Sequence, residues 1–117
     1  MSDDWARPLV HWEIEARDPE RQRAFYAEMF HWAIADGPIM DIPAGIGGPE
    51  PGPAGHIRSS DRAGVTLYIQ VRNLRESLDR AVELGGSVLI ESLQIPGGAT
   101  LARLLDPEGN PVMLVQQ

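Results

Sequence analysis

The chain has 117 residues, 43% of them apolar and 23% charged, with a formal net charge of −7. This length has room for one compact domain, since single domains most often run to about 100–150 residues, and we expect one domain over residues 1–117. The sequence contains arginine but no lysine and no cysteine, which excludes Schiff-base, thiolate, disulfide and iron–sulfur chemistry. The acidic balance disfavours a nucleic-acid partner because phosphate contacts need a positive face.

The sequence indicates no membrane segment. No apolar run approaches the roughly 20 residues that are needed to span a bilayer. Residues 1–8 read Met-Ser-Asp-Asp-Trp-Ala-Arg-Pro, which is acidic and polar, whereas a signal peptide begins basic and continues apolar. We therefore expect a cytoplasmic protein with no membrane partner.

The first predicted elements are a strand over residues 9–16 and a helix over residues 19–30. In the strand, Val10, Trp12, Ile14 and Ala16 alternate with the polar residues His11, Glu13 and Glu15, as in a half-buried strand. Asp18 can cap the helix and Pro19 suits its first position. The expected inward face of the helix consists of Ala24, Phe25, Met29 and Phe30. His31 is expected to end the helix in the left-handed conformation.

The same pattern returns in the second half of the chain. Residues 65–71 alternate like the first strand, Asn73 can cap a following helix, and Gly85-Gly86 can end that helix. We interpret this as an internal repeat, with one copy over about residues 8–60 and the other over about residues 64–117. The repeat predicts two copies of one supersecondary unit.

Each copy is expected to continue with three further strands. In the second copy these are residues 87–91, 100–105 and 112–116, and the last two are joined by the turn sequence Asp-Pro-Glu-Gly-Asn. In the first copy they are residues 33–36, 39–42 and 55–59. The segment 43–53 is dense in glycine and proline and is expected to be a loop. Each copy is thus predicted to be a β-α-β-β-β unit.

Several motifs carry a resemblance to a known family. The first strand reads His11-Trp12-Glu13-Ile14, and Asp18-Pro19 and Ala24-Phe25-Tyr26 follow it. Phe30-His31-Trp32 stands at the turn after the helix, and Leu105 to Asn110 precedes the last strand. Together with the repeat, these motifs resemble the vicinal oxygen chelate superfamily, which includes glyoxalase I, bleomycin-resistance proteins and extradiol dioxygenases. The resemblance covers nearly the whole chain.

The resemblance implies an α+β fold in which two β-α-β-β-β units form a curled mixed sheet, shaped as a cup, with helices on the convex face. It places the polar face of the first strand, with His11 and Glu13, inside the cup, and Thr66, Tyr68 and Gln70 inside it from the second copy. A small-molecule ligand is expected there. The residues predicted to bind it are His11, Glu13, His56, Arg58, Thr66, Tyr68, Gln70 and Met113. The resemblance also implies a homodimer.

A metal cofactor is not expected, although metal-dependent members of the superfamily use His and Glu ligands from the first and last strand of each unit. His11 stands at the first of these positions, but Thr66 and Met113 stand at two others. The fourth position falls near His56. The only candidate metal ligand is therefore His11, with His56 or Glu13 as further ligands if a metal binds at all.

Three functions follow from these features. The first is binding of a small organic ligand without a metal. The second is a metal-dependent lyase, isomerase or dioxygenase, which rests on the fold analogy and on His11. The third is drug sequestration in the manner of bleomycin-resistance proteins, because an acidic cup would attract a cationic glycopeptide. The sequence does not decide whether the protein is an enzyme, nor which ligand it binds.

The strand alternation also predicts an order of stabilities. Truncation of a residue that lines a solvated cavity costs little, whereas truncation of a residue packed beneath a helix costs roughly 2–5 kcal/mol. His11→Ala and Tyr68→Ala are therefore expected to melt close to the wild type. Ile14→Ala and Leu67→Ala are expected to melt far lower.

Overall fold

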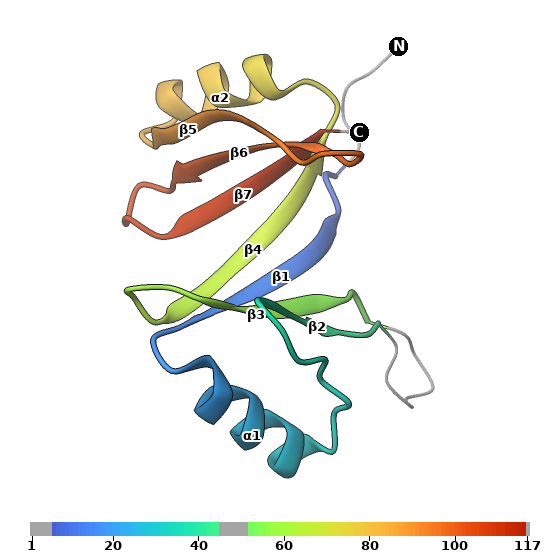
Figure 1. Ribbon diagram of the computed structural model, residues 1–117. Coiled ribbons are helices and arrows are strands. Elements are labelled where there is room, and N and C mark those ends of the chain that lie inside the picture. Colours follow the sequence, from blue (N-terminus) through green and yellow to red (C-terminus); the bar gives the residue numbers. More distant parts are fainter. Residues whose placement is uncertain (1–5, 45–51, 117) are drawn as a thin grey trace. The chain divides into compact units, whose positions relative to one another are not determined.

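The structure is a computed structural model that describes residues 6–44 and 52–116. In this part of the chain it contains seven strands and two helices (Figure 1). They are β1 (Leu9–Ala16), α1 (Pro19–Phe30), β2 (Ile39–Ile42), β3 (Gly55–Ser59), β4 (Gly64–Val71), α2 (Leu74–Glu83), β5 (Ser87–Gln94), β6 (Thr100–Leu105) and β7 (Pro111–Gln116). The predicted α+β class is confirmed. Most of the predicted loop 43–53 lies outside the described residues.

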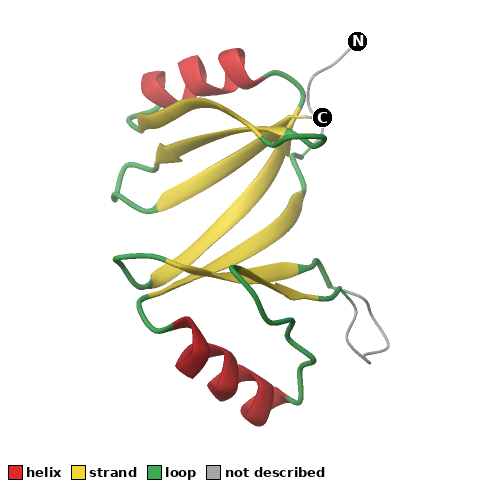
Figure 2. Cartoon of the chain, viewed as in Figure 1, coloured by secondary structure: helices red, strands yellow, loops and turns green. Residues whose placement is uncertain are grey.

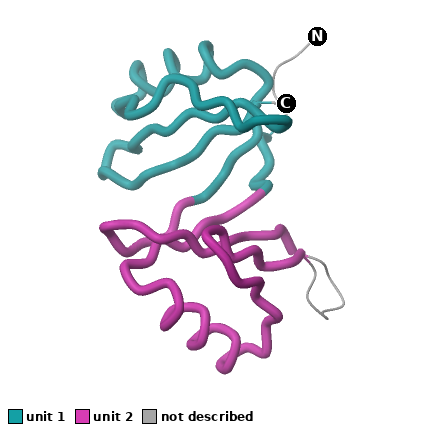
Figure 3. Tube along the Cα trace, in the orientation of Figure 1, with its two compact units in different colours: residues 1–10, 67–117 teal, residues 11–66 magenta. Residues whose placement is uncertain are grey.

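The chain forms two compact units (Figure 3). Unit 1 consists of residues 1–10 and 67–117, and unit 2 of residues 11–66. Each contains one helix and a mixed sheet (Figure 2). None of the helices in the described residues is long and apolar enough to cross a membrane.

Unit 2 contains β1 from His11 onward, α1, β2 and β3, in the strand order β2-β3-β1. β1 and β3 are parallel, and β2 is antiparallel to β3. The predicted strand at residues 33–36 is wrong, because this segment has no strand structure. Ile34 is nevertheless buried, so its apolar side chain contributes to the core without strand pairing. Gly37, with φ of 115°, and Pro38, which has no N–H, then turn the chain into β2.

Helix α1 begins and ends as predicted, but it packs through a different face. Asp18 accepts a hydrogen bond from the backbone N–H of Arg21 at 3.2 Å, and His31 ends the helix with φ of 59°. The expected inward face is wrong, since Ala24, Phe25, Met29 and Phe30 are exposed. Tyr26 and Ala27 pack against the core instead, and Tyr26 stacks on Trp32 with ring centroids 5.8 Å apart. This stacking sets the rotation of the helix.

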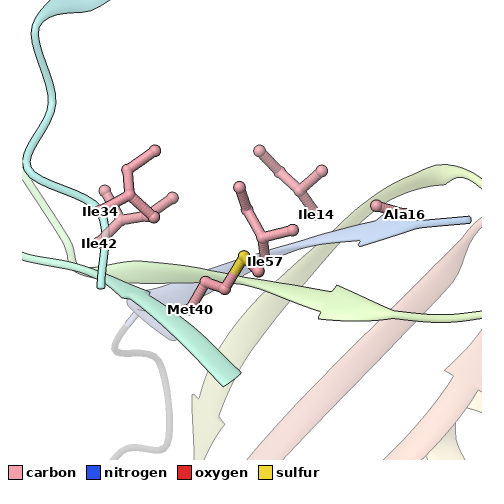
Figure 4. Packing of buried hydrophobic residues seen from close by; sticks show 6 residues of the cluster. All are labelled: Ile14, Ala16, Ile34, Met40, Ile42 and Ile57. Atoms are coloured by element: carbon pink, nitrogen blue, oxygen red, sulfur yellow. The ribbon is translucent and has the colours of Figure 1, made fainter. Parts of the chain in front are cut away.

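The core of unit 2 lies on one face of its strands (Figure 4). Its buried residues are Ile14, Ala16, Ile34, Met40, Ile42 and Ile57. Trp12 packs against them from β1. The prediction that Trp12, Ile14 and Ala16 share the core face of the first strand is therefore confirmed, and the alternating residues His11, Glu13 and Glu15 belong to the opposite face.

A close approach between Trp12 and Gly55 holds β1 against the start of β3. A Cβ atom on Gly55 would overlap the Trp12 indole ring, and the indole N–H donates to the Pro53 carbonyl oxygen at 2.9 Å. We expect Gly55→Ala to lower the free energy of unfolding by roughly 1–3 kcal/mol, because the ring must move. Urea denaturation measures this loss. Gly52→Ala is the control, since nothing lies within 4 Å of its Cβ position, and equal midpoints for the two variants would contradict the prediction.

Unit 1 contains β4 from Leu67 onward, α2, β5, β6 and β7, in the strand order β4-β7-β6-β5. β4 and β7 are parallel and the other pairs are antiparallel. Asn73 caps α2 as predicted by accepting from the backbone N–H of Glu76 at 2.9 Å. β5 is longer than the predicted 87–91, and its pairing with β6 shifts register twice, as at β-bulges, where one strand carries an extra residue.

Unit 1 has two apolar clusters. The first lies under α2 and contains Val71, Leu74, Leu78, Ala102, Leu104 and Leu114, with Ile69 packed against it. The second contains Tyr68, Leu101, Met113 and Val115, with Val10 packed against it. Because Leu114 belongs to one cluster and its neighbours Met113 and Val115 to the other, both faces of β7 are apolar.

These clusters correct three sequence-based expectations. Leu67 does not pack beneath α2, since its side chain is 45% exposed and the α2 cluster reaches only to Ile69 on this strand. Tyr68 is only 9% exposed and belongs to the second cluster. Most of its side chain is therefore packed against other residues and does not face solvent. Val10 packs against this second cluster and not under α1.

Candidate functional site

Unit 2 carries a group of buried polar side chains on the sheet face opposite its apolar core. In the described residues the buried polar or charged side chains are Glu13, Glu15, His56 and Thr66. The parallel register pairs Glu13 with His56 and Glu15 with Arg58, which places these side chains on one face. We call the set His11, Glu13, Glu15, His56, Arg58 and Thr66 the polar face of unit 2.

A continuous chain of hydrogen bonds runs through this face. The His11 Nε2 atom lies 2.7 Å from His56 Nδ1, and His56 Nε2 lies 2.9 Å from Glu13 Oε1. Arg58 donates from Nε to the same Glu13 oxygen at 2.8 Å and from Nη2 to Glu13 Oε2 at 3.4 Å. The two imidazole rings are 4.9 Å apart between centroids. His11 is half-buried at the other end of this chain.

The charge on Glu13 determines the direction of the hydrogen bonds. Burial raises the pKa of Glu13, but hydrogen bonds from His56 and Arg58 and the charge of Arg58 outweigh it and hold the pKa at about 2. An ionised carboxylate only accepts, so His56 Nε2 carries the proton of that bond. The proton in the bond between His56 Nδ1 and His11 Nε2 belongs to His11 when His56 carries one proton and to His56 when it carries two.

His11 is kept in its neutral form. Burial lowers the pKa of His11 below its ordinary value of 6.5, and the nearby His56 lowers it further, whereas Asp41 and Glu13 act in the opposite direction. A neutral imidazole has one donor and one acceptor nitrogen. The ring at the end of the chain can therefore form hydrogen bonds of both kinds.

The second carboxylate, Glu15, is only 2% exposed and is bound from several sides. Arg58 Nη2 donates to Glu15 Oε2 at 3.2 Å, so one guanidinium group bridges Glu13 and Glu15. Ser60 and Thr66 donate their hydroxyl groups to Glu15 at 3.0 and 3.3 Å. Arg62 Nε lies 3.7 Å from Glu15 Oε1. Both buried charges thus have cationic partners, as buried carboxylates require.

The structure brings together five of the residues that the sequence singled out as ligand-binding. His11, Glu13, His56, Arg58 and Thr66 all belong to unit 2 and to its polar face. Tyr68, Gln70 and Met113 belong to unit 1, where Tyr68 and Met113 are buried in an apolar cluster and Gln70 is half-buried. Their part in a ligand site stays a prediction.

The ligand-binding set omitted Glu15, Ser60 and Arg62. Alternation along the first strand places Glu15 on the same face as His11 and Glu13, so that signal was present. Ser60 and Arg62 follow β3 in a turn and have no periodic pattern that could have indicated their contacts with Glu15.

The side chains at the superfamily's metal positions do not fit a divalent ion. Both ring nitrogens of His56 are engaged, one with His11 and one with Glu13. The Thr66 hydroxyl donates to Glu15, and the Met113 thioether lies in an apolar cluster with Arg103 Nη1 at 3.7 Å. In the described ranges, no three His, Asp or Glu side chains are arranged to hold a metal ion. Hard divalent ions prefer oxygen and nitrogen donors in an open set.

Solved structures with the same fold support the sequence resemblance. A glyoxalase/bleomycin resistance protein/dioxygenase superfamily member from Vibrio splendidus 12B01 has a TM-score of 0.67 at 12% identity, and the match covers 96% of this chain and 100% of that one. Methylmalonyl-CoA epimerase from Mycobacterium tuberculosis has a TM-score of 0.61 at 15% identity, covering 92% of this chain and 86% of that one. At such identities the likeness shows the fold alone.

A family model gives the assignment. Among proteins of curated function, none has a sequence that matches this chain. The model of the Glyoxalase-like domain, however, matches residues 11–115, which is most of the chain. The protein therefore belongs to the Glyoxalase-like domain family.

Proposed function

We propose that this protein binds a small organic ligand at the polar face of unit 2 without a metal ion, and that His11 is the hydrogen-bonding anchor for that ligand. The observation that carries the proposal is the chain from Arg58 through Glu13 and His56 to His11. Buried polar networks that are hydrogen-bonded throughout hold their members rigidly. A rigidly held imidazole at a half-buried position is suited to orienting a ligand.

The charges on this face support a neutral or cationic ligand. Three carboxylates, Glu13, Glu15 and Asp41, act there against two guanidinium groups, Arg58 and Arg62. This excess of negative charge disfavours an organic anion.

Drug sequestration remains the second candidate because the acidic excess suits a cationic glycopeptide such as bleomycin. A metal-dependent lyase, isomerase or dioxygenase is not supported by the side chains present. His56 would have to release His11 or Glu13 before it could bind an ion, and breaking a hydrogen-bonded buried charge costs several kcal/mol.

Ligand-observed NMR with three sets of polar fragments, composed of neutral molecules, cations and anions, tests the proposal. We expect hits among the neutral molecules or cations, and we expect His11→Phe to weaken them at least tenfold, since one good hydrogen bond to a buried site is worth about 1.4 kcal/mol or more. His31→Asn is the control, because His31 only ends α1 and Asn tolerates the left-handed conformation. Bleomycin is titrated separately by calorimetry.

The same preparation is analysed for metals after mild dialysis. We expect less than stoichiometric zinc, iron, nickel or manganese. About one ion per chain would overturn the metal-independent proposal and favour the lyase, isomerase or dioxygenase hypothesis. Fragment binding that survives both His11→Phe and His56→Gln would show that the ligand binds elsewhere.

A further inference from the structure

Unit 1 contains a cavity that is separate from the polar face of unit 2. Its volume is about 600 Å³, within the range of small-molecule sites. It is lined by Arg7, Val71, Arg72, Asn73, Glu76, Ser77, Arg80, Ala81 and Leu84. All of these residues belong to unit 1.

The cavity concentrates positive charge in an acidic protein. Among the described residues, the guanidinium groups of Arg7, Arg72 and Arg80 line it together with the carboxylate of Glu76, whereas the whole chain has a net charge of −7. The three arginines come from three segments, which are the residues before β1, the turn between β4 and α2, and α2 itself. A backbone hydrogen bond of 3.0 Å from Gln70 N–H to the Pro8 carbonyl oxygen holds the first segment next to β4.

One wall of the cavity is apolar. Val71 and Leu84 line it together with Ala81, and Val71 belongs to the core cluster under α2. Arg80 contacts Glu83 at 3.1 Å, but both side chains are 66% exposed, and such exposed pairs contribute little. The cavity thus combines cationic and apolar surfaces.

The backbone N–H groups of Leu74 and Glu76 in the first turn of α2 are not the donors that would bind an anion in this cavity. The Leu74 N–H donates to Gln116 Oε1 at 2.7 Å, and the Glu76 N–H donates to Asn73 Oδ1 at 2.9 Å. These two backbone donors are therefore already engaged within the protein. Recognition of a ligand in this cavity has to come from the arginine side chains.

We propose that this cavity binds a small phosphate ester whose organic group is apolar. Guanidinium groups bind phosphate through paired hydrogen bonds and remain charged at any physiological pH. Several guanidinium groups together suit a dianionic phosphate better than a ligand with one carboxylate. The volume of the cavity and the wall formed by Val71, Ala81 and Leu84 leave room for an apolar group. The site is independent of the ligand proposed for unit 2.

Isothermal titration calorimetry with 1-naphthyl phosphate tests the proposal, with inorganic phosphate and 1-naphthol as the two halves of the probe. We expect the ester to bind more tightly than either half. We expect Arg72→Gln and Arg80→Gln each to weaken binding at least tenfold, and we expect the affinity to fall as NaCl rises because charge attraction is screened. Thermal melting of each variant checks that the fold is retained.

Arg75→Gln is the matched control. Arg75 lies on the same helix but does not line the cavity, and it pairs with Asp79 and Glu91. We expect it to leave the affinity unchanged. An equal loss with Arg75→Gln, equally tight binding of 1-naphthol, or no binding at millimolar ester would overturn the proposal. His11→Phe is expected to bind the ester normally, which separates this site from the one proposed in unit 2.

Discussion

Replacement of Arg58 by Met is expected to lower the free energy of unfolding by about 3 kcal/mol at pH 7, the lower end of the usual cost of removing one partner from a buried ion pair, because the Arg58 side chain itself is 37% exposed. Arg58 contacts both Glu13 and Glu15, each only 2% exposed. Without the guanidinium group, two carboxylates remain buried close to each other. Urea denaturation followed by circular dichroism measures the loss.

Arg75→Met is the control for this experiment, because its partners Asp79 and Glu91 are exposed and such pairs contribute at most about 1 kcal/mol. A loss for Arg58→Met no larger than that of the control would contradict the assignment of Arg58 as the bridging cation.

The pH dependence provides an independent check. The pKa of Glu13 is about 2 in the folded protein, below the value of about 4.3 in an unfolded chain. The stabilisation from Glu13 is therefore fully present above the unfolded value and is lost as the pH falls toward 2. In Arg58→Met one of the groups that hold this pKa down is gone, so Glu13 can take up a proton at higher pH. We expect the difference between wild type and variant to shrink below about pH 4.5.

Ile14→Ala and Leu67→Ala are expected to differ by about 2–3 kcal/mol in their effect on stability. Ile14 is 4% exposed in the core of unit 2, whereas Leu67 is 45% exposed. Truncation of a buried isoleucine costs about 2–5 kcal/mol, and truncation of a half-exposed leucine removes far less contact. Tyr68→Ala is expected to resemble Ile14→Ala, because Tyr68 packs with Leu101, Met113 and Val115.

Chemical denaturation of the three variants decides between this order and the one predicted from alternation alone. If Leu67→Ala were the most damaging and Tyr68→Ala the least, the face of β4 that carries Leu67 would be buried and the face that carries Tyr68 would be exposed. His11→Ala provides the comparison on the polar face, where the expected loss is small relative to Ile14→Ala.

Local signals predicted most of the fold. Asp18 with Pro19, and Asn73 with the backbone N–H of Glu76, define where the helices begin, because capping depends on neighbouring residues alone. The parts that failed depend on tertiary contacts. Apolar residues occupy several sides of the second half of α1, so periodicity could not select Tyr26 over Phe25. The stacking of Tyr26 on Trp32 selects it.

The sequence predicted several residues of the candidate site, but it did not predict the contacts between their side chains. Alternation placed His11 and Glu13 on one face, and the resemblance drew attention to His56. The contact between His11 and His56 depends on the parallel register of β1 and β3, two strands that are far apart in the sequence. Both faces of β7 are apolar, and on β4 Tyr68 packs in one cluster while Ile69 and Val71 pack in the other. Alternation therefore could not separate a residue that lines a site from one that packs in a core.

The way in which the chain is divided between the two units has a consequence for folding during synthesis on the ribosome. Unit 2 is one continuous stretch of chain, residues 11–66, whereas unit 1 joins residues 1–10 to residues 67–117. Since chains emerge from the N-terminus and compact units fold as they become complete, unit 2 can assemble while the second half is still being translated. In unit 1, β4 obtains its parallel partner only when β7, the last strand, has been made. The buried carboxylates of unit 2 would then acquire their arginine partner early in translation.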